Sequence, residues 1–319
     1  MKFLRAVLAL ALAALAPAAA GQQGTITMIL GFPAGATSDI LSRIVADHMR
    51  ETLGQPVIVE NKPGAGGRIA NEAVKNASPD GSTILMTPVA AMAIFPHSFA
   101  GQLRYDSFKD YEPVAHLSDF QLAIGVAANV PAKTLAEYVA LVKKDSKYGF
   151  YASAAAGSIP HFLGVMFAKS AGIQLTHVPY KGTANVLQAL AAGEISAATT
   201  LAADIGTLVK SDRARLLAVS GEKRDPAFPN VPTFKESGYN MSGTGWYGLF
   251  APAGTPKAAI DRLSKAAIAA IKDPAVNQRL AKMGLEPTGY GPQELGRILK
   301  ADYDKWGSII RESGFKPGG

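Results

Sequence analysis

The sequence predicts an α/β protein with two lobes, and three observations lead to that fold class. Short apolar runs alternate with segments whose apolar residues recur at helical spacing, which indicates βαβ units and a mostly parallel sheet. An apolar run that passes through small residues into a helix start occurs at residues 32–39 and again at 153–161. We call these the first turn and the second turn. The length of 319 residues also suits one two-lobed protein or two domains.

The first twenty residues predict a secretory signal peptide. Lys2 and Arg5 form a short basic start, and residues 7–15 are an apolar run too short for a typical membrane span. The small residues 18–20 predict cleavage near Ala20 and export to the periplasm; an uncleaved anchor is the alternative. No later segment is long and apolar enough to span a membrane.

Composition excludes several classes of function. The chain has no cysteine, which excludes disulfides, thiolate catalysis and a lipoprotein anchor. Its formal charge is +7, but the basic residues form no run and do not cluster with aromatic residues, so no nucleic-acid partner is expected. The surplus can steer anionic ligands, or it can serve solubility alone.

The segment from 25 to 111 contains the first turn. An apolar strand at 25–30 leads into a helix for which Thr37, Ser38 and Asp39 are candidate N-caps. Gly35 permits a tight turn, and the free amides of such a helix start form an anion site; an ordinary strand–turn–helix connection is the alternative. The further elements expected are a strand at 56–60, a glycine-rich loop at 61–67, a helix at 69–76, a strand at 83–86 and a small-residue stretch at 87–95.

Residues 114–238 repeat the alternation around the second turn. Ser158 is the expected N-cap of the helix that follows this turn, with Pro160 in its first helical positions. Two such turns in two lobes can grip one anion from both sides. The elements expected are strands at 114–117, 122–126, 149–152, 175–180, 196–201 and 216–220, helices at 131–144, 185–192 and from 202, and a proline-rich connector at 225–238.

The last part of the chain is predicted to be one strand and a helical tail. In the strand at 246–250, Trp246 is either a lid over a ligand or a buried strand aromatic. Thr255 is expected to cap the next helix, with Pro256 at its first position. The helices expected are 257–271, 273–283 and 292–313.

No catalytic, metal or cofactor constellation is visible. The glycines at 64–67 lack the third glycine of a dinucleotide motif and the acidic residue that should follow it. The five histidines have no metal-ligand spacing, and no nucleophile elbow is present. Ser153 or Ser158 could be paired with His161 as nucleophile and base, but their local spacing alone supports no catalytic triad. For His161, a ligand or capping role and a packing role are the alternatives. We therefore predict a binding protein without metal or cofactor, and not an enzyme.

Short motifs along the mature chain resemble those of the periplasmic receptors of tripartite tricarboxylate transporters, the Bug receptors. They are Phe-Pro-Ala-Gly-Ala-Thr-Ser-Asp at 32–39, Val-Glu-Asn-Lys-Pro-Gly-Ala-Gly-Gly at 59–67, Ser-Pro-Asp-Gly at 78–81, Tyr-Ala-Ser at 151–153, His-Val-Pro-Tyr-Lys-Gly at 177–182, Val-Pro-Thr at 231–233 and Leu-Phe-Ala-Pro-Ala-Gly-Thr-Pro at 249–256. Two departures from the family pattern narrow the space at the site, namely Ala36 and the Ala-Ala-Gly run at 155–157.

The resemblance implies a two-lobed periplasmic-binding-protein-like fold of type II with a ligand cleft between the lobes. Residues 21–119 and 226–319 would form lobe 1 and residues 120–225 lobe 2. The two turns would hold one carboxylate through backbone amides and water, and the family's ligands are di- and tricarboxylates, aromatic carboxylates and some amino acids. The implied site residues are Phe32, Ala34, Gly35, Ala36, Thr37, Asp39, Thr87, Ala90, Ser153, Ala156, Gly157, Ser158, His161, Thr200 and Asp204.

The resemblance also implies how the receptor acts. A monomer would close on a small carboxylate like a flytrap and deliver it to the membrane subunits of a tripartite tricarboxylate transporter. Two alternatives are a ligand-sensing receptor for a signalling partner and an exported enzyme that acts on a carboxylate.

Overall fold

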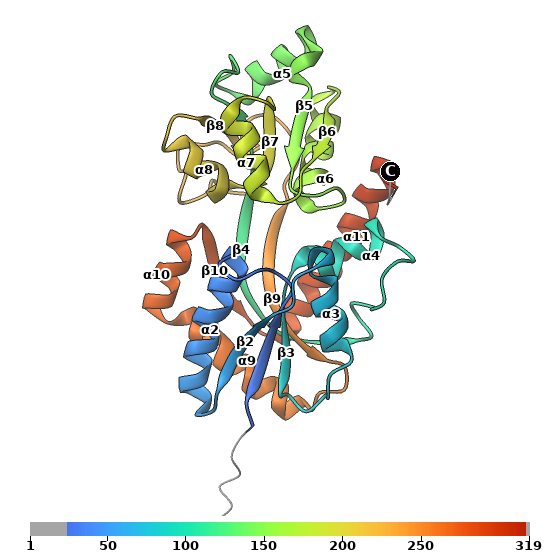
Figure 1. Ribbon diagram of the computed structural model, residues 1–319, viewed down its shortest axis with the longest axis vertical. Coiled ribbons are helices and arrows are strands. Elements are labelled where there is room, and N and C mark those ends of the chain that lie inside the picture. Colours follow the sequence, from blue (N-terminus) through green and yellow to red (C-terminus); the bar gives the residue numbers. More distant parts are fainter. Residues whose placement is uncertain (1–23, 317–319) are drawn as a thin grey trace, which may run out of the picture.

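The protein has two lobes joined by long strands that cross between them (Figure 1). Its computed structural model describes residues 24–316, so the predicted signal peptide lies outside the described residues. The lower lobe in Figure 1 contains the first part of the described chain and most of its last part, and the upper lobe contains its middle. Within the described range, no helix has both the length and the apolar character needed to cross a membrane.

The sheet of the lower lobe is built on three parallel strands. Met28 of β1 lies beside Val59 of β2 on one side and Ile84 of β3 on the other. Beyond β3, strand β9 runs antiparallel, with Leu85 beside Phe250, and β9 in turn pairs with β4. The strands are β1 (Ile26–Leu30), β2 (Val57–Asn61), β3 (Thr83–Pro88), β4 (Tyr111–Ala127) and β9 (Thr244–Pro252).

The sheet of the upper lobe is built on the second half of β4. There β4 pairs antiparallel with both β7 and β8, while β5 lies parallel to β7 and to β6. The strands are β5 (Phe150–Ser153), β6 (Thr176–Pro179), β7 (Ala197–Leu201) and β8 (Ala214–Val219).

The prediction of two strands at 114–117 and 122–126 is wrong, because both are parts of the single strand β4. The polar residues Ser118, Asp119 and Gln121 interrupt the apolar pattern where the strand passes from one lobe to the other. Pairing with β9 continues through this stretch, and the two irregularities in the register lie before it, between Pro113 and Ala115 and between His116 and Ser118.

Strand directions place the carboxyl ends of both sets of parallel strands at the junction of the lobes. Strand β4 runs parallel to β3, since both are antiparallel to β9, and it leaves the lower lobe upward. Strand β7 runs antiparallel to β4, so β7 and its parallel neighbour β5 point back down. The loops after β1 and β3 therefore face the loops after β5 and β7, and ligands in open α/β sheets bind at such ends.

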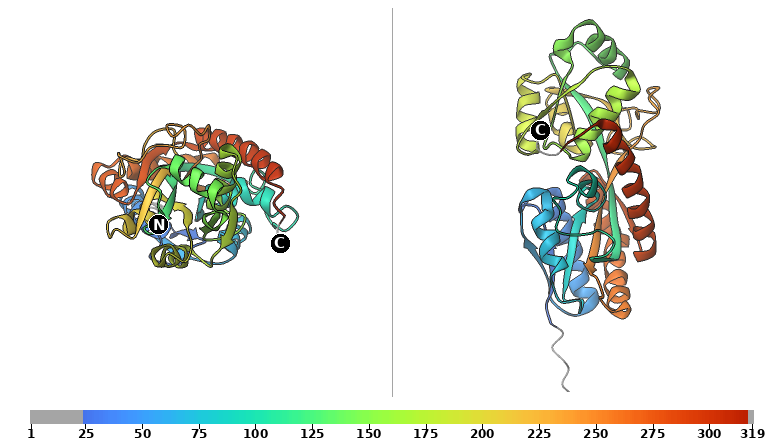
Figure 2. Two further views of the ribbon diagram at one scale, coloured as in Figure 1. Left: turned by 90° about the horizontal axis from the view of Figure 1, so that it is seen from above. Right: turned by 90° about the vertical axis from the view of Figure 1, so that its right-hand side faces the viewer.

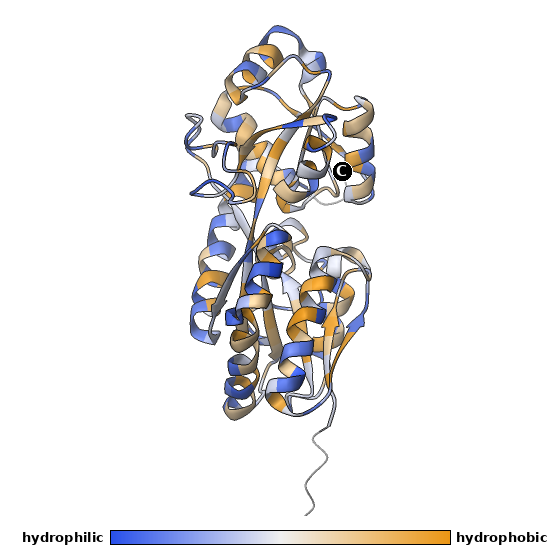
Figure 3. Ribbon diagram, turned by 90° about the vertical axis from the view of Figure 1, so that its left-hand side faces the viewer, coloured by the Kyte–Doolittle hydropathy of each residue, from blue (hydrophilic) through white to orange (hydrophobic). Residues whose placement is uncertain are grey.

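Helices cover both lobes, and hydrophobic and hydrophilic residues alternate along their ribbons (Figure 3). Apolar residues are among those that the helices bury, as Leu41, Ile44 and Val45 in the helix after β1 show. The prediction that Thr255 caps α9 is wrong, because its hydroxyl donates to the Pro252 carbonyl and Pro256 is the N-cap residue. The helices of the lower lobe are α2 (Thr37–Leu53), α3 (Arg68–Lys75), a π-helical segment (Ala90–Ile94), α4 (Phe95–Ser98), α9 (Lys257–Lys272), α10 (Pro274–Lys282) and α11 (Pro292–Ser313). Those of the upper lobe are α5 (Leu135–Lys144), α6 (Ile159–Ala171), α7 (Thr183–Ala192) and α8 (Ala202–Val209).

Strand β10 (Leu285–Tyr290) was absent from the prediction and pairs antiparallel with β4. Its short segment contains Pro287 and Gly289, which weaken a strand pattern. Pairing with β4 stabilises it in spite of that composition.

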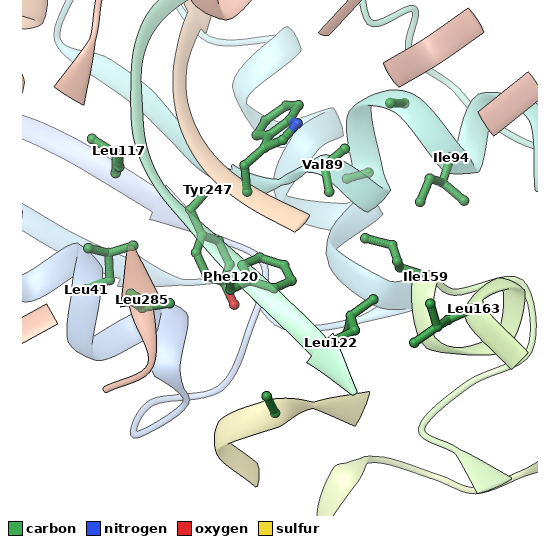
Figure 4. Packing of buried hydrophobic residues seen from close by; sticks show 14 of the residues in the cluster. Leu41, Val89, Ile94, Leu117, Phe120, Leu122, Ile159, Leu163, Tyr247 and Leu285 are labelled. Atoms are coloured by element: carbon green, nitrogen blue, oxygen red, sulfur yellow. The ribbon is translucent and has the colours of Figure 1, made fainter. Parts of the chain in front are cut away.

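The hydrophobic core is continuous through the crossing strands (Figure 4). Phe120 of β4 packs on Tyr247 of β9 with ring centroids 4.8 Å apart, at the level where the lobes meet. Trp246 is 1% exposed, so it is a buried strand aromatic and not a lid. Its indole Nε1 donates to Asp302 Oδ2 of α11 at 2.7 Å.

Two segments outside the crossing strands also connect with the upper lobe. In the connector before β9, Thr233 forms a bridge with Val219 of β8, and Phe234 packs on Phe167 of α6 at 5.5 Å. Helix α11 runs along the lower lobe and ends beside the upper lobe (Figure 2). There Glu312 pairs with Lys169 of α6.

Candidate functional site

The first turn is organised by the buried carboxylate of Asp39. Asp39 Oδ2 accepts from the amide of Gly35 at 2.9 Å, and Oδ1 accepts from Asn61 Nδ2 at 2.9 Å. Arg43, one helical turn further on, donates to both oxygens at 3.1 and 2.9 Å. Asn61 also donates to the Phe32 carbonyl, so the loop after β1 is tied to the end of β2.

The predicted N-caps of α2 are wrong. Ala36 is the N-cap residue and has no side chain to cap with, while Thr37, Ser38 and Asp39 already lie inside the helix. Asp39 reaches back from the first turn of the helix to the amide of Gly35, the residue before the N-cap. The Gly35 amide is therefore occupied, and the amides of Thr37 and Ser38 have no acceptor among residues 24–316.

Hydrogen bonding keeps Asp39 ionised. Burial raises the pKa of this carboxyl, but the hydrogen bonds from Arg43, Gly35 and Asn61 outweigh burial and leave the pKa below its usual value. Because its oxygens are already bonded, Asp39 shapes the turn rather than offering a free charge to a ligand.

The second turn follows the predicted pattern. Ser158 is the N-cap of α6, as predicted, and its hydroxyl oxygen accepts from the His161 amide while its O–H donates to the Ala155 carbonyl. Gly157 has a positive φ of 75°, and its amide donates to His161 Nδ1 at 3.1 Å. Pro160 lies in the first helical positions. The amides of Ala156 and Ser158 have no acceptor in the described part of the chain.

A stacked histidine pair supports this turn from within the upper lobe. The rings of His161 and His177 lie 4.1 Å apart, and His177 Nε2 is 2.7 Å from Ser153 Oγ. Burial lowers the pKa of His161 to about 4; burial and then the charge of His161 lower the pKa of His177 to about 3. Both rings are therefore neutral at neutral pH, so neither supplies a cation. Ser153 is fully buried and is not placed as a nucleophile.

The predicted residues at and just after the carboxyl ends of β3 and β7 differ in the groups that they offer to a ligand. Thr87 is buried, and its hydroxyl donates to Asn71 Oδ1 inside the lower lobe; Ala90 is half-buried at the start of the π-helical segment. In β7, the buried Thr200 donates through Oγ1 to Oδ2 of Asp204, in the first turn of α8, at 3.1 Å. Burial raises the pKa of Asp204. Burial also raises the pKa of the Tyr247 hydroxyl, and the negative charge of the nearby Asp204 raises it further.

Contacts from the lower lobe and from the C-terminus reach the second turn. Ser98 Oγ of α4 donates to the Gly157 carbonyl at 3.3 Å, and the Phe315 ring lies 5.4 Å from the His161 ring. The bonds of the first turn stay within its own lobe, to Arg43 and Asn61.

Sequence reasoning missed His177, Ser98 and Phe315, because each meets the second turn only through tertiary folding. A sequence signal did exist for Arg43, which stands at i+4 from Asp39 on a predicted helix.

A cavity of about 100 Å³ lies beside the crossing strands. It is lined by Phe120, Gln121, Asp225, Gly284 and Leu285, among others, and by none of the predicted site residues. Small-molecule sites are usually about 300–1,000 Å³, so this cavity is too small for a typical ligand. Among residues 24–316, no group of three or more His, Asp or Glu side chains is arranged to hold a metal ion.

Comparison with known proteins gives consistent matches. The model of the family described as "Tripartite tricarboxylate transporter family receptor" matches residues 41–315. A UPF0065 protein encoded in the gbd 5′ region of Cupriavidus necator is 33% identical over 92% of this chain and 88% of its own length.

Two solved structures extend that likeness to the fold. The periplasmic binding protein BugD is 30% identical, with a TM-score of 0.80 over 92% of this chain and 98% of its own. Rpa4515 of R. palustris, solved with adipate, is 27% identical with a TM-score of 0.83 over 91% and 97%.

Proposed function

The chain belongs to the tripartite tricarboxylate transporter family of receptors, and we propose that it captures a small carboxylate in the periplasm. In this proposal it acts as a monomer, closes its two lobes on the ligand and delivers it to the membrane subunits of a tripartite tricarboxylate transporter. The protein is a receptor and not an enzyme, since the family is one of solute-binding receptors. The adipate in Rpa4515 supports a carboxylate as the ligand class.

The observation that carries the proposal is the pair of helix starts that face each other across the junction of the lobes. Helices α2 and α6 both begin there, each after a strand whose carboxyl end points at the other lobe. The positive end of one helix is worth about 0.3–1 kcal/mol for an exposed anion and up to about 2 kcal/mol when partly buried. Hydrogen bonds to a charged acceptor add about 1.5–3 kcal/mol each. Two helix starts on one carboxylate are therefore consistent with about micromolar affinity, after the costs of binding.

The proposed contacts use the amides that the turns leave free. Those of Thr37 and Ser38 in the first turn and of Ala156 and Ser158 in the second have no acceptor among the described residues, and we assign them to the carboxylate. The side chains of Asp39 and His161 hold the turns in shape. Phe32, Ala34, Gly35, Ala36, Gly157, Ser153, Thr87, Ala90, Thr200 and Asp204 form the remaining proposed wall.

The contacts of the connector suggest a different lobe boundary from the sequence-based one at 226. Thr233 and Phe234 contact the upper lobe, at Val219 and Phe167. We therefore propose that residues 120–243 form one lobe, and that residues 24–119 and 244–316 form the other.

Binding and closure can be tested with the purified protein. Mass spectrometry of small molecules released by denaturation is expected to identify a carboxylate, and calorimetry of the emptied protein with that molecule should return saturable binding. Small-angle scattering should show a smaller radius of gyration with the ligand than without it. A ligand without a carboxylate would overturn the binding proposal, and an unchanged radius would overturn closure alone.

A pair of glycine variants tests the role of the backbone at the first turn. Gly35 has a φ of +84°, and a Cβ built there meets no atom within 4 Å, so the space beside it is open to a ligand. Gly35→Val should block binding. The matched control is Gly54→Val at the other end of α2, where φ is +65° and the space is also open. The control should bind normally, and normal binding by a folded Gly35→Val protein would exclude this turn as the site.

Delivery to a transporter needs a separate test. Cells that express the membrane subunits of such a transporter should take up the labelled ligand only when this receptor is present. If the receptor binds the ligand but the cells do not take it up, the proposed binding role stands and the proposed transport role is wrong.

A further inference from the structure

Asp204 is an acidic side chain that no cation accompanies. Its Oδ2 accepts from Thr200 Oγ1 at 3.1 Å, and within residues 24–316 no lysine, arginine or histidine lies within ion-pair distance of it. A carboxylate that is partly removed from water without a counter-charge is costly.

The fold places Asp204 at the junction of the lobes. It lies in the first turn of α8, directly after the carboxyl end of β7. The neighbouring Thr199 donates to the Pro160 carbonyl of α6, so the β7 end lies beside the second turn. From the other lobe, Tyr247 is close enough for the charge of Asp204 to act on its hydroxyl. Tyr247 is paired with Pro88 at the end of β3.

The neighbours of Asp204 would not balance a second negative charge. Tyr247 packs on Phe120, and Ile205 and Ala202 beside Asp204 are buried apolar residues. A dicarboxylate held at the two turns would bring its second carboxylate toward this acid with no cation between them, and two such groups cannot both stay ionised at close range. A ligand with a positive group would instead supply the missing counter-charge.

We propose that Asp204, positioned by Thr200, selects ligands that carry a protonated amine in addition to the carboxylate. The proposal rests on the function proposed above, since it assumes that the two turns hold the carboxylate. It makes the preferred ligand an aminocarboxylate zwitterion. In that respect this chain would differ from Rpa4515, whose solved structure contains the dicarboxylate adipate.

The test compares ligands that differ only in the end group. Adipate, 5-aminopentanoate and hexanoate carry a carboxylate, an ammonium and a methyl group respectively at the end of the same four-methylene chain. The same comparison is run with shorter and longer members of each series and with α-amino acids, by calorimetry on the emptied full-length mature protein. The best aminocarboxylate is expected to bind at least about tenfold more tightly than the dicarboxylate of matched length, as close charge pairs at binding sites can supply.

Asp204→Asn then tests the residue itself. The amide keeps the size of the side chain and an oxygen that accepts from Thr200. This variant should lose about tenfold or more in affinity for the aminocarboxylate and should bind the matched dicarboxylate no more weakly than the wild type does. The control is Asp212→Asn, an exposed acid just after α8 whose φ of +56° asparagine tolerates; it should leave both affinities unchanged.

Each outcome decides one of the two proposals. Tighter binding of the dicarboxylate by the wild type, or an unchanged preference in Asp204→Asn, overturns the assignment to Asp204 and leaves the carboxylate receptor intact. Proton uptake on binding adipate, seen as a dependence of the heat on the buffer, would show that Asp204 acts as a neutral acid and would overturn it as well. Binding of no carboxylate in any series would overturn the proposed function. If the Asp204→Asn protein fails to fold, the order of affinities measured with the wild type still decides whether an aminocarboxylate or a dicarboxylate is preferred.

Discussion

Replacing Gly157 by alanine should destabilise the protein more than the same change at Gly35, because only the second site is crowded. Both glycines have a positive φ, +75° and +84°, which L-residues rarely adopt. A Cβ at Gly35 meets nothing within 4 Å. A Cβ at Gly157 lies 3.1 and 3.3 Å from two ring carbons of Phe315 and 3.4 Å from the ring of Phe99.

The magnitudes follow from these two contributions. A left-handed conformation costs a non-glycine residue about 1–2 kcal/mol, and the lower entropy of the unfolded alanine chain offsets about 0.4–1 kcal/mol of this. Gly35→Ala should therefore cost about 1 kcal/mol. Crowding costs about 1–3 kcal/mol, and the lower end applies here because Phe315 is half-buried near the chain end and can shift. Gly157→Ala should then cost about 2 kcal/mol.

Urea unfolding of a double-mutant cycle separates the two contributions. In a Phe315→Ala background, the cost of Gly157→Ala should fall to about that of Gly35→Ala, which is a coupling of about 1 kcal/mol. Gly35→Ala should cost the same in both backgrounds. Equal costs at the two glycines, or a cost at Gly157 that ignores the loss of the Phe315 ring, would show that the C-terminal residues do not press on the second turn.

Three further predictions concern groups that hold the turns and the crossing strands. Asp39→Asn should lower the free energy of unfolding by about 1–2 kcal/mol at pH 7, and the loss stays modest because the partner Arg43 is half exposed. The pKa of Asp39 is lowered in the folded protein, so the advantage of the wild type should shrink as the pH falls below about 4. Urea titrations of both proteins at pH 7 and below pH 4 measure this difference. His161 and His177 have pKa values of about 4 and about 3, so below about pH 6.5 these side chains bind fewer protons in the folded than in the unfolded protein. The free energy of unfolding should therefore decline as the pH falls from about 6.5 toward 4. A His177→Gln protein whose free energy of unfolding keeps the wild-type dependence on pH would contradict this prediction. Trp246→Phe should cost about 1.5–3 kcal/mol by removing the donor to Asp302, and Asp302→Asn, which keeps an acceptor, should cost less in the same urea assay.

Most elements could be predicted from the sequence because their signals are local. The helix that begins after Ser158 has its cap, its proline and its apolar face within one short segment, and the structure places the cap as expected. The cap of α2 could not be predicted in the same way. Three cap-type residues stand in a row at 37–39, but the helix already begins at Thr37, and Asp39 bonds to the Gly35 amide from inside it.

The site was only partly accessible to sequence reasoning. The spacing of Asp39 and Arg43 on one helix face was readable, but the role of Asn61 depends on the pairing of β1 with β2. The bond between Ser153 and His177 likewise depends on the pairing of β5 with β6.

The sequence alone determined the α/β class, the two helix starts with small residues before them, and the absence of any cysteine chemistry. These follow from the identity of neighbouring residues, since turns, caps and helical periodicity involve groups only a few positions apart. Tertiary structure decided that 111–127 is one strand through both lobes, that 285–290 is a strand at all, and that the loops after β1 and β3 face those after β5 and β7. It also brought Ser98 and Phe315 to Gly157. Such contacts depend on strand pairing and packing between segments far apart in the chain, and no local pattern encodes which distant partner a strand or ring will meet.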